Sequence, residues 1–168
     1  MGGILADDMG LGKTLQAIVY ICSFPGQKTL IVCPTSLAYN WQDEFQKFAP
    51  LIRTCIVQGT PEEREALISG QDGEYDVWIT TYPLIRKDTE SYQKQKYDHI
   101  FLDEAQFIKN PSSLGAKAVK SIPADHRFAL TGTPIENALS ELWSIFDFIM
   151  PGFFMKYSRF ADAYEKPI

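Results

Sequence analysis

The sequence predicts an α/β fold in which a mostly parallel sheet carries helices on both of its faces. Short apolar runs recur along the 168 residues, and helical patterns separate most of them. Strands that are apolar throughout are typical of a sheet covered on both faces, and their alternation with helices favours parallel pairing. The strands are expected at residues 4–6, 30–33, 55–57, 77–80, 100–102 and 128–130.

Helical periodicity and capping signals predict the elements between these strands. Leu37, Trp41, Phe45 and Phe48 fall on one stripe of a helix, and a second stripe runs through residues 139–149 before Pro151. The other signals are a capping box at residues 60–63 with proline at the first helical position, and a short helix at 113–121 before a proline. Core packing is expected for Trp41, Trp78 and Trp143, whereas His99 and His126 are expected to lack nearby partners and have no assigned role.

The composition excludes several classes of protein. With 45% hydrophobic and 22% charged residues, the chain is neither mainly disordered nor a coiled coil. No apolar run approaches the roughly 20 residues that a membrane span needs. The apolar stretch at 15–24 follows Asp7 and Asp8 instead of basic residues, which argues against an export signal. No membrane association is therefore expected.

The net charge of −5 is concentrated in one segment. Residues 58–76 hold six acidic side chains and one base, while residues 105–124 hold three lysines and no acid. One face can therefore still be basic enough to meet nucleic acid. Cys22, Cys33 and Cys55 are odd in number and lack a Cys-x-x-Cys pair, so they are expected to be buried free thiols in a reducing compartment.

Polar residues follow five of the predicted strands. In an open parallel sheet the ligand lies at the carboxyl ends of the strands, so this pattern predicts a site at one sheet edge. The strand ends in question are residues 7–8, 34–36, 80–81, 103–104 and 131–133.

The segment Gly10-Leu11-Gly12-Lys13-Thr14 follows a strand and opens a helix. Glycines allow backbone N–H groups to face a phosphate, the helix adds its positive dipole end, and the lysine reaches the terminal phosphates. The threonine hydroxyl can ligate Mg²⁺. The usual pattern has a glycine where this chain has Asp7, and the alternative interpretation is a glycine-rich turn with an incidental lysine.

Adjacent carboxylates end the strand at 100–102. In phosphoryl transfer one carboxylate holds Mg²⁺ and a second group orients or deprotonates the attacking water, which predicts these roles for Asp103 and Glu104 respectively. Successive side chains point in different directions, so neighbours can divide these roles. The hydroxyls of Thr131-Gly132-Thr133 can bond to this acidic motif, although a tight turn explains that tripeptide nearly as well.

Taken together, these segments resemble the first five motifs of the Swi/Snf-type ATPases, which belong to helicase superfamily two. The resemblance covers nearly the whole chain, and that family also has an acid at the position of Asp7. This chain departs from the usual family residues at Asp8, where glutamate is common, and at Glu136, where glutamine is common. The matching segments are residues 2–14, 33–37 with 40–41, 79–82, 103–106 with 108–110, and 130–137 with 141–143.

The resemblance implies a DNA-dependent ATPase, helicase-like, that translocates along double-stranded DNA. Two RecA-like lobes would face each other, with ATP in the cleft between them and DNA across both. Residues 1–152 would form the first RecA-like P-loop NTPase lobe, and the aromatic tail at 153–168 would lead toward the second lobe. The compartment would be the cytoplasm, at the nucleoid in a bacterium, or the nucleus in a eukaryote.

The family's functional residues carry over to matching positions here. Catalytic roles fall to Lys13, Asp103 and Glu104, and Mg²⁺ ligation falls to Thr14 and Asp103. ATP binding is implied for Asp8, Met9, Gly10, Leu11, Gly12, Lys13, Thr14 and Gln106. Coupling of nucleotide to DNA is implied for Gln106, Thr131, Gly132 and Thr133, and DNA contact for Pro34, Thr35, Ser36, Thr80, Thr81, Tyr82 and Lys109.

The second lobe, with its arginine, and the segment that usually grips adenine have no counterpart in these 168 residues. An arginine supplied in trans contributes roughly 10³ to 10⁵ in rate, so the chain by itself is expected to be nearly inactive. The apolar tail either forms an exposed patch that favours self-association or folds back on the core. Its members are Phe153, Phe154, Met155, Tyr157, Phe160 and Tyr164.

Three other functions are alternatives to a DNA-dependent ATPase. A DEAD-box RNA helicase shares the fold, but that family reads Asp-Glu-Ala-Asp and Ser-Ala-Thr where this chain has residues 103–106 and 131–133. A non-catalytic binding or scaffold module is a second alternative. A small-molecule kinase is disfavoured because nothing in the sequence indicates a phosphoacceptor site.

Overall fold

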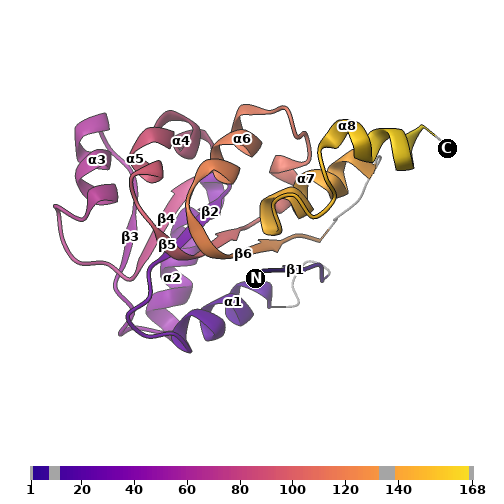
Figure 1. The fold of residues 1–168 in the computed structure, drawn as a ribbon. Helices are drawn as coiled ribbons and strands as arrows, with labels where there is room; N and C mark the ends of the chain where they lie inside the picture. The colour runs from indigo at the N-terminus through magenta and orange to yellow at the C-terminus, as the bar shows by residue number, and fades with distance from the viewer. Residues whose placement is uncertain (1, 8–11, 133–138, 167–168) are drawn as a thin grey trace.

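The computed structural model describes residues 2–7, 12–132 and 139–166, and within them one six-stranded sheet forms the centre of the molecule (Figure 1). Every strand pair is parallel, and the strand order is β1-β6-β5-β2-β4-β3. All six predicted strands are confirmed. Their bounds are β1 Gly3–Leu5, β2 Thr29–Cys33, β3 Thr54–Ile56, β4 Val77–Thr81, β5 Tyr97–Leu102 and β6 Ala124–Leu130.

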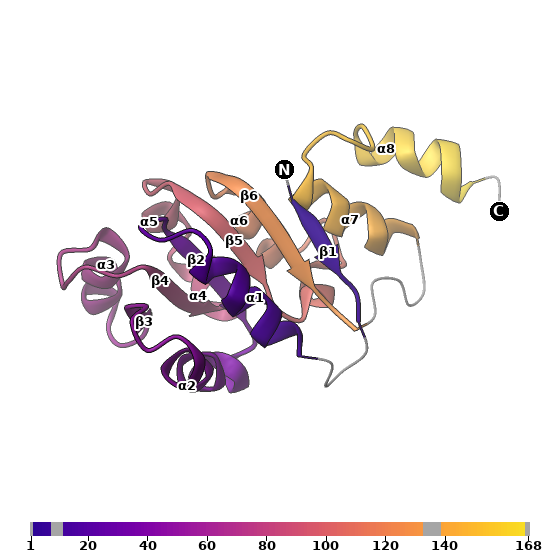
Figure 2. The same ribbon diagram turned by 90° about the horizontal axis from the view of Figure 1, so that it is seen from below.

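Helices cover both faces of the sheet, as Figures 1 and 2 show. One core layer packs α1 (Lys13–Cys22) and α2 (Ala38–Phe48) on the first face. The second core layer, on the opposite face, involves the helices that follow β3. These are α3 Pro61–Ser69, α4 Tyr82–Lys87, α5 Thr89–Gln93, α6 Leu114–Ser121 and α7 Leu139–Ile149, with short 3₁₀ turns at Thr35–Leu37 and Ala105–Ile108.

The predicted helix starts are confirmed by their capping contacts. The Thr60 hydroxyl accepts a hydrogen bond from the backbone N–H of Glu63 at 3.2 Å, and the Glu63 carboxylate accepts one from the backbone N–H of Thr60 at 2.7 Å. At α6 the Ser113 hydroxyl accepts from the backbone N–H of Ala116 at 3.2 Å. Each contact satisfies N–H groups that a helix start leaves unpaired.

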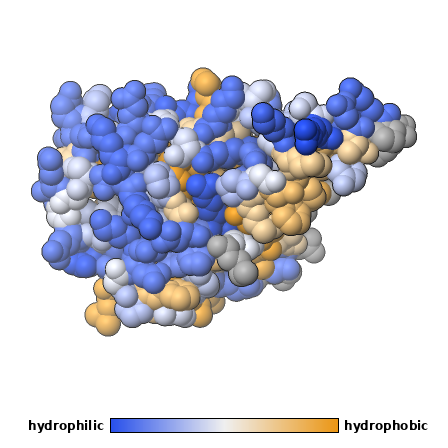
Figure 3. Space-filling view, in the orientation of Figure 1, coloured by the Kyte–Doolittle hydropathy of each residue, from blue (hydrophilic) through white to orange (hydrophobic). Residues whose placement is uncertain are grey.

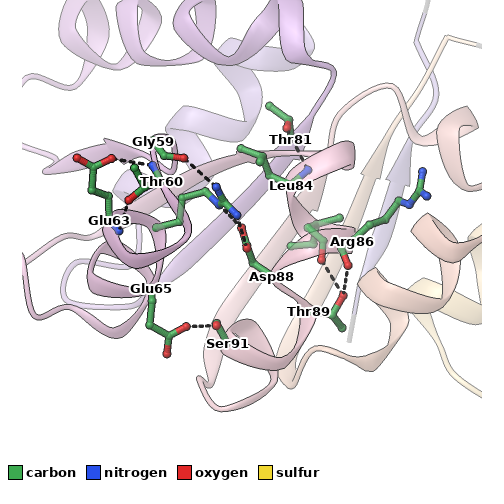
Figure 4. A network of polar contacts seen from close by, with 12 residues as sticks. Gly59, Thr60, Glu63, Glu65, Thr81, Leu84, Arg86, Asp88, Thr89 and Ser91 are labelled. Carbon is green, nitrogen blue, oxygen red and sulfur yellow. Dashed lines mark hydrogen bonds and ion pairs between the residues drawn. The ribbon is translucent and has the colours of Figure 1, made fainter.

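A buried ion pair joins α3 to the junction of α4 and α5. The Arg64 guanidinium donates to the two carboxylate oxygens of Asp88 at 2.7 and 2.8 Å, and to the Gly59 carbonyl at 2.8 Å. Its side chain is 10% exposed and that of Asp88 11%. Figure 4 shows this network around Asp88 and Gly59. The only base of the acidic segment 58–76 therefore ties together neighbouring helices on one face of the sheet.

The cysteine expectation holds at two positions and is wrong at the third. Cys33 and Cys55 are buried, but Cys22 is exposed. Cys22 is the last residue of α1, where the chain turns away from the sheet, so its apolar neighbourhood in sequence does not become a buried one. The three tryptophans lie in the core as predicted, with Trp41 at 1% exposure.

The expectation that the two histidines lack partners is wrong. His99 and His126 lie in the neighbouring strands β5 and β6, in register, with their rings stacked 5.3 Å apart. The His99 ring also meets the ring of Tyr20 edge-on at 5.2 Å, and its Nε2 lies within hydrogen-bond distance of the Gln27 side-chain oxygen. The strand order, which the sequence does not state, creates this pair.

Burial, followed by the neighbouring His126, lowers the pKa of His99 below its ordinary value of 6.5. Because the pKa of His99 is lower in the folded state, the unfolded chain takes up this proton more readily. The free energy of unfolding therefore decreases as the pH falls below about 6.5. We expect His99→Gln to make the acid limb of the stability profile shallower, by at most about 1.4 kcal/mol per pH unit. Urea unfolding between pH 7.5 and 5.5 measures this slope, and an unchanged slope would contradict the assignment.

The segment after α7 is partly packed and partly exposed. Phe160 is 4% exposed, and its ring contacts that of Phe154 at 5.4 Å, which in turn meets Phe146 of α7 at 5.0 Å. Phe153 is 62% exposed and Tyr164 is 50% exposed. Figure 3 shows hydrophobic residues gathered over this segment beside α8 (Tyr157–Phe160). Across the described residues, no helix combines the length and the apolar composition that crossing a bilayer requires.

Candidate nucleotide site at the carboxyl edge of the sheet

The parallel sheet brings the ends of its central strands to one edge. Asp103 directly follows β5, and its backbone N–H donates to the carbonyl of Val32 in β2 at 2.8 Å. Thr131 directly follows β6, and its N–H donates to the carbonyl of Leu5 in β1 at 3.1 Å. These contacts align the acidic motif and the end of β6 with the strand that precedes Lys13. The predicted convergence of polar strand ends is therefore present.

The start of α1 supplies the positive groups of the site. Gly12 is the N-cap of the helix that begins at Lys13. Its φ of 77° and ψ of 29° place it in the left-handed region, which residues other than glycine rarely adopt. The Lys13 ammonium donates to the Asp7 carbonyl at 2.6 Å. The expected phosphate-binding residues Asp8, Met9, Gly10 and Leu11 lie outside the described residues, so the geometry of this motif rests on Gly12, Lys13 and Thr14.

The Asp103 carboxylate is buried and held on both oxygens. Oδ1 accepts a hydrogen bond from the backbone N–H of Glu104 at 2.9 Å, and Oδ2 accepts one from the indole N–H of Trp41 at 2.8 Å. Burial raises the pKa of Asp103, while the Trp41 hydrogen bond opposes that change. A hydrogen bond to the ionised form favours the charge that a metal ligand needs.

A chain of polar side chains runs from the acidic motif to the end of β6. The Gln106 amide nitrogen donates to the Glu104 carboxylate, and the Thr131 hydroxyl donates to the Gln106 side-chain oxygen at 3.0 Å. Glu104 has φ 49°, a left-handed conformation that costs a non-glycine residue free energy and is enriched at functional sites. The hydroxyl at position 131 thus reaches the acidic motif through Gln106. Gly132 lies next to this contact, and Thr133 lies outside the described residues.

Lys13, Asp103 and Glu104 line one cleft of about 490 Å³ between α1, α2 and the end of β5. That volume falls within the usual range for small-molecule sites. Its walls combine a cation, a hydroxyl and three carboxylates with apolar and polar side chains. The lining residues are Gly12, Lys13, Thr14, Leu15, Leu37, Asn40, Trp41, Glu44, Phe48, Asp103 and Glu104.

The donor set of this cleft fits Mg²⁺. Thr14 and Asp103 contribute hard oxygen atoms, which Mg²⁺ prefers. Within the part of the chain that the structure describes, no group of three or more His, Cys, Asp or Glu side chains is placed to form a complete cage. A site with few protein oxygens matches an ion that keeps several waters and shares its coordination with substrate phosphates.

The residues expected to contact DNA are divided between surface and core. Thr35 and Ser36 are exposed in the turn after β2, and Pro34 is half-buried. Lys109 is 41% exposed and forms an ion pair with Glu141 at 3.6 Å. Among these residues, Thr35 and Ser36 are the ones whose side chains lie open at the surface.

The side chains of Thr80, Thr81 and Tyr82, which were also expected to contact DNA, are all buried. Thr80 and Thr81 complete β4, an interior strand of the sheet, and the Thr81 hydroxyl caps α4 by accepting a hydrogen bond from the N–H of Leu84 at 3.4 Å. The Tyr82 hydroxyl points inward and donates to the backbone carbonyl of Asp103 at 2.7 Å.

Sequence reasoning missed a site residue at Trp41. Its apolar stripe indicated core packing, which is confirmed, but its N–H also reaches the carboxylate of Asp103. A buried tryptophan usually needs a partner for that N–H, and this was the available signal. The identity of the partner required the strand order, because α2 follows β2 and β2 lies beside β5.

The chain is similar in sequence to a known protein family and to several characterised and uncharacterised proteins. A family model described as the SNF2-related domain matches residues 1–168. The chain is 43% identical over 182 residues to the TATA-binding protein-associated factor MOT1 of Saccharomyces cerevisiae, covering 99% of this chain and 10% of that protein. It is 42% identical over 170 residues to an uncharacterized ATP-dependent helicase of Mycoplasma pneumoniae, covering 98% of this chain and 16% of that protein.

A solved structure shares the fold. The SWI2/SNF2 ATPase core of Sulfolobus solfataricus in complex with dsDNA is 40% identical with a TM-score of 0.86, over 98% of this chain and 34% of that one. The chain therefore spans about a third of that core and a smaller part of the relatives above.

Proposed function

This chain belongs to the family of SNF2-related domains, as the N-terminal RecA-like lobe of a SNF2-type ATPase, and from that premise we propose its activity. In the full-length protein it binds ATP with Mg²⁺ and hydrolyses ATP in a reaction that double-stranded DNA stimulates and that drives translocation along the duplex. The observation that supports this most directly is the convergence of Lys13, Thr14, Asp103 and Glu104 on one cleft.

The roles follow from the chemistry of each side chain. Lys13 exchanges its contact with the Asp7 carbonyl for the terminal phosphates of the nucleotide. Asp103 and Thr14 hold Mg²⁺, which supplies charge neutralisation at the phosphates. Glu104 orients the attacking water and accepts its proton. Gln106 and Thr131 connect that carboxylate to the end of β6.

The DNA partner is proposed from the family and from the exposed polar turn. Thr35 and Ser36 are exposed and carry hydroxyls and backbone N–H groups. Such uncharged donors commonly form hydrogen bonds to the phosphate oxygens of DNA. Lys109 adds a cation on the same lobe. Residues 1–152 form this lobe, and residues 153–168 lead toward a second RecA-like lobe across the cleft. Such a protein acts at the nucleoid of a bacterium or in the nucleus of a eukaryote.

Steady-state ATP hydrolysis by the full-length protein tests this function. We expect duplex DNA to raise the rate and single-stranded RNA to leave it near the basal level, with Lys13→Ala as the inactive control. Stimulation by RNA instead of duplex DNA would favour an RNA helicase. A folded wild-type protein with no hydrolysis above the control under either condition would favour a non-catalytic binding module.

A further inference from the structure

Two hydrogen bonds connect Asp103 to the segments that were expected to touch DNA. From the segment after β2, the Trp41 indole N–H reaches Oδ2 of the carboxylate at 2.8 Å. From the segment after β4, the Tyr82 hydroxyl reaches the backbone carbonyl of the same residue at 2.7 Å. One contact fixes the side chain of Asp103 and the other fixes its main chain.

Both donors are held rigidly in the core. Trp41 is 1% exposed and packs against Phe45 with ring centroids 6.3 Å apart. Tyr82 is 4% exposed and lies parallel to Phe107, with an interplanar angle of 8° and centroids 4.9 Å apart. Because both rings are closely packed, we expect each to move together with the element that carries it.

Each of these elements continues directly from a candidate DNA segment. The exposed turn at Thr35–Leu37 runs into α2 without a break, and Trp41 lies one turn into that helix. Tyr82 is the first residue of α4 and follows the buried threonines of β4. A displacement of either segment is therefore carried to Asp103 through one buried ring and one hydrogen bond.

We propose that Trp41 and Tyr82 are positioning residues, which orient Asp103 for Mg²⁺·ATP and transmit to it contact at the two segments that were expected to meet DNA. This proposal rests on the function proposed above for the cleft. It assigns Tyr82 an inward role in place of the direct DNA contact expected from the sequence. Groups that orient a metal ligand typically change metal affinity or activity 10- to 100-fold when they are removed.

The test compares Trp41→Phe with Trp78→Phe in the full-length protein. Trp78 is a matched control because it is also buried, at 4% exposure, and its indole N–H also makes a hydrogen bond, to the Leu67 carbonyl at 2.9 Å. Both variants lose one tryptophan N–H contact, but only Trp41 touches Asp103. The first readout is the Mg²⁺ concentration needed for half-maximal binding of a non-hydrolysable fluorescent ATP analogue. The second is the DNA-stimulated turnover number at saturating ATP.

We expect Trp41→Phe to raise the required Mg²⁺ concentration and to lower the DNA-stimulated turnover number, each by about tenfold. Trp78→Phe is expected to match wild type in both, with thermal melting used to confirm that the two variants are comparably folded. Equal behaviour of the two variants, or no change in either readout for Trp41→Phe, would overturn the proposal. If wild type itself hydrolyses no ATP, the proposed function fails, and the binding measurement still decides the role of Trp41.

Tyr82→Phe tests the second contact, because it removes only the hydroxyl. We expect the affinity for duplex DNA to stay at the wild-type value while the maximal stimulation by DNA falls several-fold. A loss of DNA affinity with full stimulation at saturating DNA would instead restore a direct contact and overturn the positioning role.

Discussion

Replacing Glu104 with glutamine is expected to slow ATP hydrolysis by the full-length protein about 10²- to 10⁴-fold, because a neutral amide cannot accept the proton of the attacking water. The glutamine keeps the shape of the side chain, and its oxygen can still accept the hydrogen bond that Gln106 donates. Nucleotide binding is therefore expected to remain near that of wild type. Steady-state hydrolysis and titration with a fluorescent nucleotide measure the two effects separately.

Glu44→Gln is the matched control for this experiment. Glu44 lines the same cleft from α2, so the substitution removes one negative charge from the same surroundings without touching the acidic motif. We expect Glu44→Gln to hydrolyse ATP at close to the wild-type rate. If both substitutions reduce the rate equally, the effect comes from the charge of the cleft, and Glu104 has no specific role in moving the proton.

The strands and most helices of this fold could be predicted because their signals are local. The capping box at Thr60 and the apolar runs depend only on residues close in sequence, and local rules describe both. The site at the carboxyl edge of the sheet could also be predicted, because parallel strands place their carboxyl ends at the same edge whatever their order. The meeting of Lys13, Asp103 and Glu104 at one edge could therefore be predicted without knowledge of which strands are neighbours.

The contacts made by Trp41, Tyr82 and His99 could not be predicted for the opposite reason. Each contact depends on the order β1-β6-β5-β2-β4-β3, in which β5 lies between β6 and β2. That order places α2 beside Asp103 and stacks His99 on His126. Periodicity reports that a side chain is buried, but not which chain segment it faces. The site residue that the sequence missed, Trp41, accordingly reaches Asp103 from a helix that follows the neighbouring strand β2.

Arg64→Ala is expected to lower the free energy of unfolding by about 3–5 kcal/mol, the range for breaking one side of a buried ion pair. The substitution leaves the Asp88 carboxylate at 11% exposure without its bidentate partner, and it deprives the Gly59 carbonyl of a donor. Asp88 also lies at the end of α4 and the start of α5, so an uncompensated charge there disturbs both helices. Urea denaturation followed by circular dichroism gives the free energy directly.

Two further variants separate the cost of a buried charge from the loss of packing. Lys96→Ala breaks an exposed pair with Asp125, whose side chains are 69% and 49% exposed, and is expected to cost less than about 1 kcal/mol. The double variant Arg64→Met with Asp88→Leu removes both charges and keeps apolar volume, so it is expected to recover most of the stability that Arg64→Ala loses. A double variant as unstable as Arg64→Ala would show that the hydrogen bond to Gly59 and the shape of the guanidinium stabilise this junction. Recovery would show that the ion pair adds little net stability to this junction compared with apolar side chains of similar volume.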